Sequence, residues 1–330
     1  MYKEKIVIWG TARRAAMYSQ WLLTHFDVIA YVSINAIAGM IYGIPVITPS
    51  EVEAAKPDAI VICVEIPQVE NIRNEIECVS PRLLNVCKTI DEVVDTYDGD
   101  YLSFVNKRQI AVIKELLVAS NDEISDYAWM YQRIIEYGVF CFYEERWLEE
   151  EYFWTVYGLQ QIPEEFASFC NHISTLTVNT AAEVGVYRGR SAYFMCAILA
   201  RKNPNFTYKM IDLYDRLDDF EMFHDILPQL EKCIPATSDD FKDEEYDYVF
   251  IDADHSYDAS MKDFENMGLR AKQLVAFHDI YAHEYDCENG GTVRTWREVL
   301  ERTSDKEYHV FSKYPDRWMG IGCIEMDGGI

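Results

Sequence analysis

Short apolar segments alternate with amphipathic segments near the start of the chain. Three segments have the nearly continuous apolar character of parallel strands covered on both faces: Lys5–Trp9, Val28–Val32 and Ala59–Val64. Between them, Thr11–Leu23 and Pro67–Cys78 place their apolar residues at helical spacing. This alternation predicts a small doubly wound α/β domain over residues 1–97.

Residues 98–175 have a different pattern. They contain no β-rich run of comparable strength and are dense in aromatic and acidic residues. Ile110–Val118 and Tyr127–Ile135 show helical periodicity. We expect connecting helices here, with the aromatic residues packed in a core or between domains.

The strand–helix alternation returns over residues 176–330. Six segments are predicted strands: Thr180–Val186, Thr207–Leu213, Tyr246–Ile251, Gln273–Phe277, Tyr308–Ser312 and Ile321–Glu325. Three segments are predicted helices: Gly189–Arg201, Asp218–Glu231 and Thr292–Arg302. Because no helix separates the last two strands, they should form an antiparallel hairpin at the sheet edge. The sequence thus predicts two doubly wound, Rossmann-like α/β domains joined by a helical connector.

Composition narrows the range of partners. The 330 residues include 56 acids and 30 bases, for a net charge of −26, which repels nucleic-acid phosphates. No apolar run reaches the length of a membrane span, and the start resembles a strand rather than a signal peptide. We therefore expect a cytoplasmic protein that binds neither nucleic acid nor membrane. The nine scattered cysteines lack a C-x-x-C pair, so they indicate neither a disulfide framework nor a cysteine zinc site.

The first glycine turn is a poor match to the dinucleotide fingerprint G-x-G-x-x-G. Gly10 keeps the first glycine, whereas Ala12 and Ala15 replace the second and third. Ser33 and Asn35 stand near the end of the second strand, where an acid would bind the ribose. We therefore expect a Rossmann-like domain that does not bind NAD.

This N-terminal stretch resembles the small Rossmann-like domains of sugar-modifying enzymes, including nucleotide-sugar acetyltransferases. The matching segments are Ile6–Gly10 and Tyr42–Pro49. The resemblance implies a nucleotide-sugar or another anionic ligand, or a docking module. Arg13 and Arg14 at the predicted helix N-terminus can hold an anion.

A second glycine turn follows the strand that begins at Thr180. Glu183, Gly185 and Gly189 form the pattern E-x-G-x-x-x-G, with Tyr187 inside the turn and Ser191 at the start of the next helix. The glycines let a ligand lie against bare backbone, and the helix N-terminus attracts a carboxylate. Since Glu183 can receive an ammonium group, the turn suits an amino-acid moiety better than a pyrophosphate.

One further position fits a nucleoside. Asp212 ends the next strand, about thirty residues after Glu183, where a carboxylate accepts hydrogen bonds from ribose hydroxyls. Ser238 lies in an acidic loop before the fourth strand.

Polar residues follow two strands that should be neighbours. Asp252, Asp254 and His255 come directly after one strand, and His278 and Asp279 after the next. The carboxyl ends of parallel strands form the ligand crevice of α/β sheets, so these side chains should converge. Such a cluster suits a divalent cation or a general base.

Together these motifs resemble class I S-adenosylmethionine-dependent methyltransferases, in particular a family with F-I-D-A/G-D-H-S-Y and a later F-H-D. The matching segments are Phe250–Tyr257, Phe277–Asp279 and the Gly290–Glu298 helix. Leu269–Gln273 departs from the family, which has a proline-glycine-glycine turn there. The resemblance implies a seven-stranded sheet with an antiparallel closing hairpin. It also implies cofactor contacts at Glu183, Gly185, Tyr187, Gly189, Ser191, Asp212, Ser238 and Asp252.

Related O-methyltransferases bind magnesium through acids at the ends of strands four and five. Carried over, the ligands are Asp252 and Asp279, with His278 in place of one acid. Histidine is a poorer magnesium ligand than a carboxylate, so metal dependence stays open. Without a metal, His255 or His278 becomes the general base beside Asp252.

The sequence predicts an S-adenosylmethionine-dependent O-methyltransferase acting on a hydroxyl of a small molecule such as a sugar or nucleotide-sugar. Two alternatives remain at this point. One is a non-catalytic nucleotide-binding module for assembly; the other is an NAD-linked enzyme that uses the N-terminal domain. A homo-oligomer is also left open.

Overall fold

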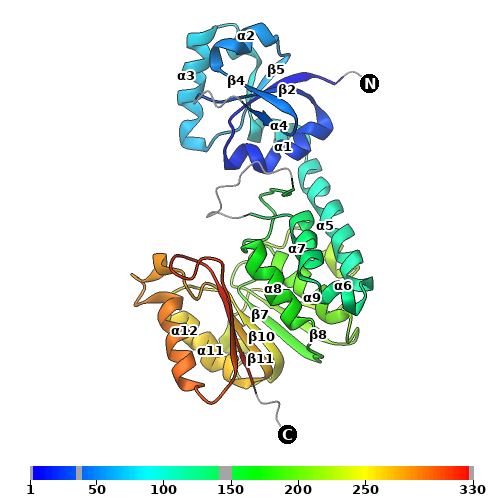
Figure 1. Cartoon of the computed structure of the whole chain (residues 1–330), viewed down its shortest axis with the longest axis vertical. Coiled ribbons are helices and arrows are strands. Elements are labelled where there is room, and N and C mark those ends of the chain that lie inside the picture. The colour runs from blue at the N-terminus through cyan, green and yellow to red at the C-terminus, as the bar shows by residue number, and fades with distance from the viewer. Residues whose placement is uncertain (1–2, 35–38, 141–150, 327–330) are drawn as a thin grey trace. The chain divides into compact units, whose positions relative to one another are not determined.

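The computed structural model describes residues 3–34, 39–140 and 151–326 (Figure 1). Asn35 and Cys141 lie outside the described residues. The chain forms two compact units. The N-terminal unit contains residues 1–109 and 135–158, and the C-terminal unit contains residues 110–134 and 159–330.

The N-terminal unit contains a six-stranded sheet in the order β3-β4-β2-β1-β5-β6. Its strands are β1 (Lys5–Trp9), β2 (Asp27–Val32), β3 (Met40–Ile41), β4 (Ile44–Ile47), β5 (Ala59–Ile62) and β6 (Cys87–Thr89). Its helices are α1 (Arg13–His25), α2 (Val52–Ala55), α3 (Val69–Val79) and α4 (Ile90–Thr96). All paired strands are parallel except β3 and β4, so the predicted doubly wound α/β class is confirmed.

In the described part of the stretch expected to connect the two α/β parts lie four helices: α5 (Asp100–Val118), α6 (Asn121–Ser125), α7 (Tyr127–Tyr137) and α8 (Pro163–Ile173). Residues of this stretch are shared between the two units, because 110–134 and 159–175 belong to the C-terminal unit. The three-part division at residues 97 and 175 stays a prediction.

The C-terminal unit contains a seven-stranded sheet in the order β12-β13-β11-β10-β7-β8-β9. Its strands are β7 (Thr180–Val184), β8 (Thr207–Ile211), β9 (Leu230–Cys233), β10 (Tyr246–Ile251), β11 (Ala271–Phe277), β12 (Tyr308–Phe311) and β13 (Ile321–Glu325). Its remaining helices are α9 (Arg190–Ala200), α10 (Phe220–His224), α11 (Tyr257–Asn266) and α12 (Gly291–Arg302). The last two strands pair antiparallel at the edge, as predicted.

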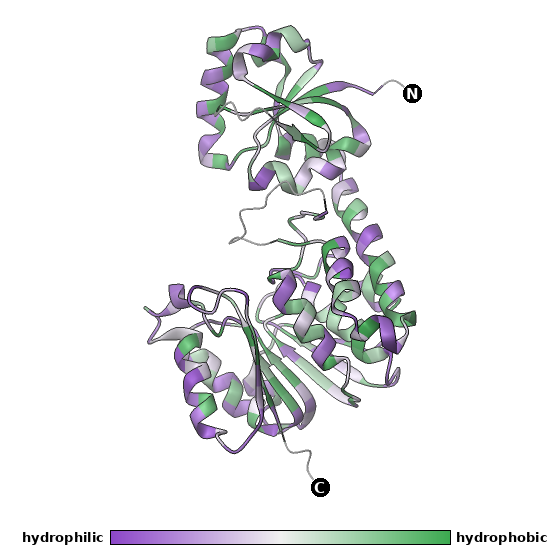
Figure 2. Cartoon of the chain, in the orientation of Figure 1, coloured by the Kyte–Doolittle hydropathy of each residue, from purple (hydrophilic) through white to green (hydrophobic). Residues whose placement is uncertain are grey.

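Helices cover both faces of this sheet. On one face, Phe264 of α11 and Trp296 of α12 pack with Val249 and Phe277 of the strands. On the other face, Phe169 of α8 stacks on Phe250 with ring centroids 5.6 Å apart. Figure 2 shows the strands mostly in hydrophobic colours and the helices in mixed colours, as expected for a buried sheet between amphipathic helices.

One predicted helix is wrong over much of its length. Asp218–Glu231 was expected to be helical, but the helix covers only Phe220–His224, and Leu230–Cys233 forms the edge strand β9. Pro228 interrupts the segment because it cannot continue a helix. The residues after it instead pair parallel with β8.

Strand register sets the position of the candidate site. Val184 of β7 pairs with Ile251 of β10, and Ile251 pairs with Phe277 of β11. The ladder continues past these pairs, because the N–H of Asp252 donates to Val184 and the N–H of His278 donates to Ile251. The residues that follow the three strands therefore lie side by side at the carboxyl ends of these strands. No helix in the described part of the chain is both long and apolar enough to cross a membrane.

Candidate functional site

The glycine turn after β7 is held tightly against the end of β10. Gly185 has a φ of +91°, and a Cβ there would lie 2.1 Å from the carbonyl oxygen of Asp252. Gly189 has a φ of +75°, and a Cβ there would lie 2.7 Å from the Tyr193 ring. Both glycines are therefore required by packing within the protein, as well as by any ligand that approaches the turn.

Glu183 is fully buried below this turn, and its carboxyl group has partners inside the protein. Ser191 Oγ donates to Oε1 at 2.5 Å and Tyr208 OH donates to Oε2 at 2.8 Å. Burial raises the pKa of Glu183 to about 8, although both hydrogen bonds act in the opposite direction. The side chains of Glu183 and Ser191, both predicted to contact the cofactor, thus form a hydrogen bond with each other.

Asp212 lies at the carboxyl end of β8 and fixes the glycine turn. Its carboxylate accepts the backbone N–H groups of Tyr187 at 2.8 Å and Tyr214 at 2.9 Å. These bonds support Tyr187 in the left-handed conformation, with a φ of 48° and a partly exposed side chain. Each carboxylate oxygen keeps a further lone pair, so Asp212 still has acceptor capacity for a ribose.

Ser238 is buried, and its hydroxyl is used within the protein. Ser238 Oγ donates to Asp263 at 2.6 Å and accepts a hydrogen bond from Asn266 at 3.0 Å. Burial raises the pKa of Asp263 to about 6. The side chain of Ser238 therefore ties its loop to α11, which leaves the neighbouring backbone as the part able to face a ligand.

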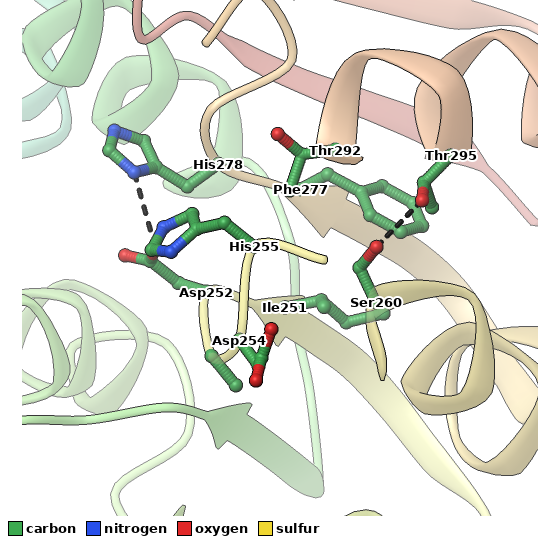
Figure 3. Close-up of a pocket in the computed structure, with 10 residues that line it drawn as sticks. Ile251, Asp252, Asp254, His255, Ser260, Phe277, His278, Thr292 and Thr295 are labelled. Atoms are coloured by element: carbon green, nitrogen blue, oxygen red, sulfur yellow. Dashed lines mark hydrogen bonds and ion pairs between the residues drawn. The ribbon is translucent and has the colours of Figure 1, made fainter. Parts of the chain in front are cut away.

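The structure brings four predicted side chains into one cluster, and Figure 3 shows three of them, Asp252, His255 and His278. His278 Nδ1 lies 3.2 Å from Asp252 Oδ1 and 3.3 Å from Asp279 Oδ2. His255 Nε2 lies 2.7 Å from Asp279 Oδ2 and 3.9 Å from Asp252 Oδ1. We call these four residues the Asp–His cluster.

Asp254 does not join the Asp–His cluster. Its carboxylate accepts the N–H of Ser256, the residue directly before α11, at 2.8 Å. Its pKa is lowered by hydrogen bonds to Ser256, as is usual for an acid that fixes a turn. The sequence pattern could not separate Asp254 from Asp252 because both follow the same strand.

The charges of the cluster stabilise one another. Burial would lower the pKa of His278, but Asp279 and Asp252 outweigh burial and raise it well above its usual value. The pKa of His255 is also raised, because the bond and charge of Asp279 exceed the effect of burial. In turn the two histidines lower the pKa of Asp279 against the effect of burial. The two carboxylates therefore favour the protonated form of His278 over the neutral form.

The backbone holds the cluster in a defined position. Asp279 is in the left-handed region with a φ of 60°, a conformation that aspartate tolerates better than most residues. Thr292 Oγ1 donates to the Asp279 carbonyl at 2.7 Å and fixes this strand end against α12. Such a costly conformation is maintained only where surrounding contacts determine it.

Three residues that the sequence analysis missed also lie at or near the cluster. Gln161 Nε2 donates to Asp252 Oδ2 at 3.3 Å. The Tyr285 ring stacks on His255 with centroids 4.4 Å apart and planes 10° apart. Buried Glu165 lies close enough to be influenced by the charge of His278, and burial raises the pKa of Glu165 to about 7. Gln161 and Glu165 are distant in sequence from the strand ends, so no local pattern indicated them.

A small pocket lies beside the Asp–His cluster (Figure 3). Asp252, His255 and His278 form its polar side, while Ile251 and Phe277 are apolar lining residues. Ser260 and Thr295 share a hydrogen bond of 2.6 Å at the same pocket. The cavity volume of about 10 Å³ has room for about one water molecule, so the pocket supplies converging polar groups rather than space for a whole ligand.

The first glycine turn, in the N-terminal unit, has a different environment. A Cβ at Gly10 would lie 2.5 Å from the carbonyl oxygen of Cys63, the residue directly after β5, so this close contact requires the glycine. Arg13 is paired with Glu65, and Arg14 is paired with Asp91. The two arginines predicted to hold an anion are therefore already bound to acids.

Comparison with known proteins identifies part of the C-terminal unit. Residues 182–280 match the family model for a methyltransferase domain. Among curated proteins no match was found.

Solved structures similar to this chain include an O-methyltransferase from Bacillus cereus in complex with SAH, at 12% identity and a TM-score of 0.40, covering 52% of this chain and 83% of that one. The O-methyltransferase TomG from Streptomyces achromogenes, solved with SAM, has 14% identity and a TM-score of 0.35. The match covers 48% of this chain and 77% of TomG. SAH-bound methyltransferase PaMTH1 from Podospora anserina has 12% identity and a TM-score of 0.38, covering 48% and 76%.

Proposed function

From the methyltransferase domain that residues 182–280 form, we propose that this protein is an S-adenosylmethionine-dependent O-methyltransferase of small molecules. The sequence analysis also predicted a methyltransferase for this half of the chain. The sulfonium methyl group would move to a hydroxyl oxygen of the acceptor. The acceptor is, in our proposal, a sugar or another small hydroxylated metabolite.

The donor side of the proposal rests on the turn after β7. Gly185, the N-terminus of α9 and Asp212 surround the carboxyl ends of β7 and β8. Helix N–H groups attract a carboxylate, and a strand-end acid accepts ribose hydroxyls. Because the backbone of Gly185 touches that of Asp252, a cofactor at this turn would lie next to the Asp–His cluster.

The Asp–His cluster is the observation that carries the acceptor side. As the oxygen–methyl bond forms, the sulfur–methyl bond breaks and its electron pair stays on the sulfur of S-adenosylhomocysteine. The acceptor hydroxyl must lose its proton, and a positioned carboxylate or imidazole can take it. Asp252, His255 and His278 lie at the strand ends where such an acceptor would sit, with Asp279 orienting both imidazoles. The remaining requirement is alignment of the oxygen with the methyl group.

A divalent cation is compatible with part of the same cluster. Asp252, His278 and Asp279 have potential ligand atoms that all lie within 4.8 Å of one another. The two carboxylates fit a hard cation such as Mg²⁺, whereas the imidazole fits it less well. When bound, Mg²⁺ would orient the acceptor and favour its deprotonated form. Metal assistance is thus a second form of the proposal, in which Asp252 and Asp279 hold the ion.

The sugar part of the proposal rests on the N-terminal unit. Its strand and turn segments resemble those of sugar-modifying enzymes, and its Rossmann-like sheet fits that resemblance. Since Arg13 and Arg14 already pair with acids, any nucleotide-sugar would have to be recognised by other groups.

The experiment uses the full chain with methyl-labelled S-adenosylmethionine and a panel of sugars, nucleotide-sugars and phenols. We expect calorimetry to show S-adenosylhomocysteine binding and at least one acceptor to gain the label. Activity that EDTA abolishes and magnesium restores would support the metal form, while EDTA-resistant activity would support the cluster alone. If neither S-adenosylmethionine nor S-adenosylhomocysteine binds while NADH does, the proposal is wrong.

A further inference from the structure

Three side chains converge on the face of the C-terminal sheet that α8 covers, in a group distinct from the Asp–His cluster. His172 lies in the last turn of α8, His309 lies in edge strand β12, and Glu325 ends strand β13. Their potential ligand atoms all lie within 4.8 Å of one another. The two imidazole rings are adjacent, with centroids 4.5 Å apart and planes tilted by 50°. The three residues are far apart in sequence, so only folding brings them together.

The spacing of these atoms resembles that of a metal site. His172 Nε2 lies 3.0 Å and His309 Nε2 lies 3.6 Å from Glu325 Oε1. A tetrahedral zinc ion with bonds of about 2.0–2.2 Å holds its ligands about 3.4 Å apart. Both contacts to the carboxylate are therefore near the ligand spacing of zinc before any side chain moves.

The chemistry of the donors agrees with the spacing. Two imidazoles and one carboxylate are typical zinc ligands and leave a fourth position for water or another ligand. Glu307 Oε1 is 3.8 Å from His309 Nε2 and is a candidate for that position. Among the described residues, Glu325 forms ion pairs with the two histidines and with no lysine or arginine. Its carboxylate is therefore not neutralised by a permanently charged side chain.

His172 Nε2 is the most informative atom of the group. It is buried, lies 3.0 Å from Glu325 Oε1 and makes no well-aligned hydrogen bond to any described residue. This nitrogen is therefore placed to coordinate an ion that Glu325 also binds.

We propose that His172, His309 and Glu325 form a binding site for a divalent transition-metal ion of the zinc class, which joins edge strand β12 to helix α8. This site is independent of the methyltransferase proposal. Glu165, seven residues or about two turns before His172 on α8, already accepts the N–H groups of Lys313 at 2.7 Å and Gly320 at 3.0 Å. The ion would add a second attachment between the same helix and the closing hairpin.

The test uses chelator-treated full-length protein titrated with Zn²⁺ alone against a chromogenic competitor chelator. His172→Gln and His309→Gln keep a polar side chain of similar length but remove the imidazole. We expect each variant to lose the same single zinc equivalent, or to bind it at least 10–100-fold more weakly, because loss of mere outer-shell support already costs about that much. Zinc held by the Asp–His cluster would remain in both variants.

His283→Gln is the matched control, because His283 is an exposed histidine that also pairs with an acid, Asp286 at 3.0 Å. It should keep the wild-type zinc stoichiometry. Hydrogen exchange adds a second measurement: zinc should slow exchange of the β12 amides in wild type and not in His172→Gln. If both site variants keep every zinc equivalent at wild-type affinity, or if zinc leaves β12 exchange unchanged, the proposal is wrong and the three residues only share a proton.

Discussion

Replacing Glu183 by glutamine should stabilise the C-terminal unit, and increasingly so as the pH rises. Burial raises the pKa of Glu183 from 4.5 to about 8, so the folded protein keeps this carboxyl protonated at neutral pH. The unfolded chain releases that proton near pH 4.5. The contribution of protonated Glu183 to the free energy of unfolding is therefore fully present below pH 4.5 and is lost progressively as the pH rises to about 8.

The magnitude follows from the size of this interval. Each pKa unit corresponds to about 1.4 kcal/mol, so wild type should have lost about 3 kcal/mol at pH 7 relative to acidic pH through this group. Glutamine is neutral at every pH and can replace the hydrogen bonds, donating through its amide to one hydroxyl and accepting from the other. The free energy of unfolding of Glu183→Gln should thus exceed that of wild type by less than 1 kcal/mol at pH 5 and by about 3 kcal/mol at pH 7.

Urea unfolding of the full chain at pH 5, 6, 7 and 8 measures this difference. Glu301→Gln, which removes an exposed acid from α12, is the matched control and should leave the pH dependence unchanged. A Glu183→Gln variant that is less stable than wild type throughout, or a difference that stays flat from pH 5 to pH 8, would refute the reasoning. S-adenosylhomocysteine affinity tests the alternative, in which Glu183 binds the cofactor ammonium: loss of a charged hydrogen bond would cost about 1.5–3 kcal/mol.

Three further predictions follow from the described contacts. Asp252→Asn and His278→Ala should each slow methyl transfer to a proven acceptor by about 10²–10⁴-fold. The affinity of each variant for S-adenosylhomocysteine should stay within a few-fold of wild type. Unchanged transfer rates would show that the cluster is structural. Gly185→Ala should abolish cofactor binding measured by calorimetry, because the Cβ of the alanine would lie 2.1 Å from the Asp252 carbonyl oxygen. Cofactor binding with wild-type affinity in this variant would contradict the prediction. NADH should cause no thermal shift, since the first turn lacks a second glycine; a shift lost in Gly10→Val would overturn that prediction.

The long, strongly patterned elements could be predicted from the sequence alone. Lys5–Trp9 and Tyr246–Ile251 form strands with the predicted limits, because a parallel strand buried on both faces has a continuous apolar sequence. β9 could not be predicted in this way. It is a short edge strand with Glu231 and Lys232 exposed, so pairing with β8 rather than its own pattern determines its structure.

The Asp–His cluster could be predicted because its members follow adjacent strands in the chain. The neighbours contributed by other elements could not. Gln161 contacts the cluster and Glu165 lies near it, both from the segment around the start of α8, about 90–115 residues earlier in the sequence. Sequence also placed Glu183 and Ser238 as cofactor contacts, but it cannot show that their side-chain oxygens have partners inside the protein. Side-chain direction depends on packing, and a single sequence contains no measure of it.

The position of β13 has a consequence for how this domain is synthesised. β13 is later in the chain than every other described strand, yet it lies between β12 and β11 rather than at the edge. Until residues 321–325 have left the ribosome, β11 has β10 on one side and an open edge on the other. An open strand edge is a template for pairing with other chains. His278 and Asp279 directly follow β11, so this part of the sheet stays unprotected until β13 has been synthesised and has paired with β11.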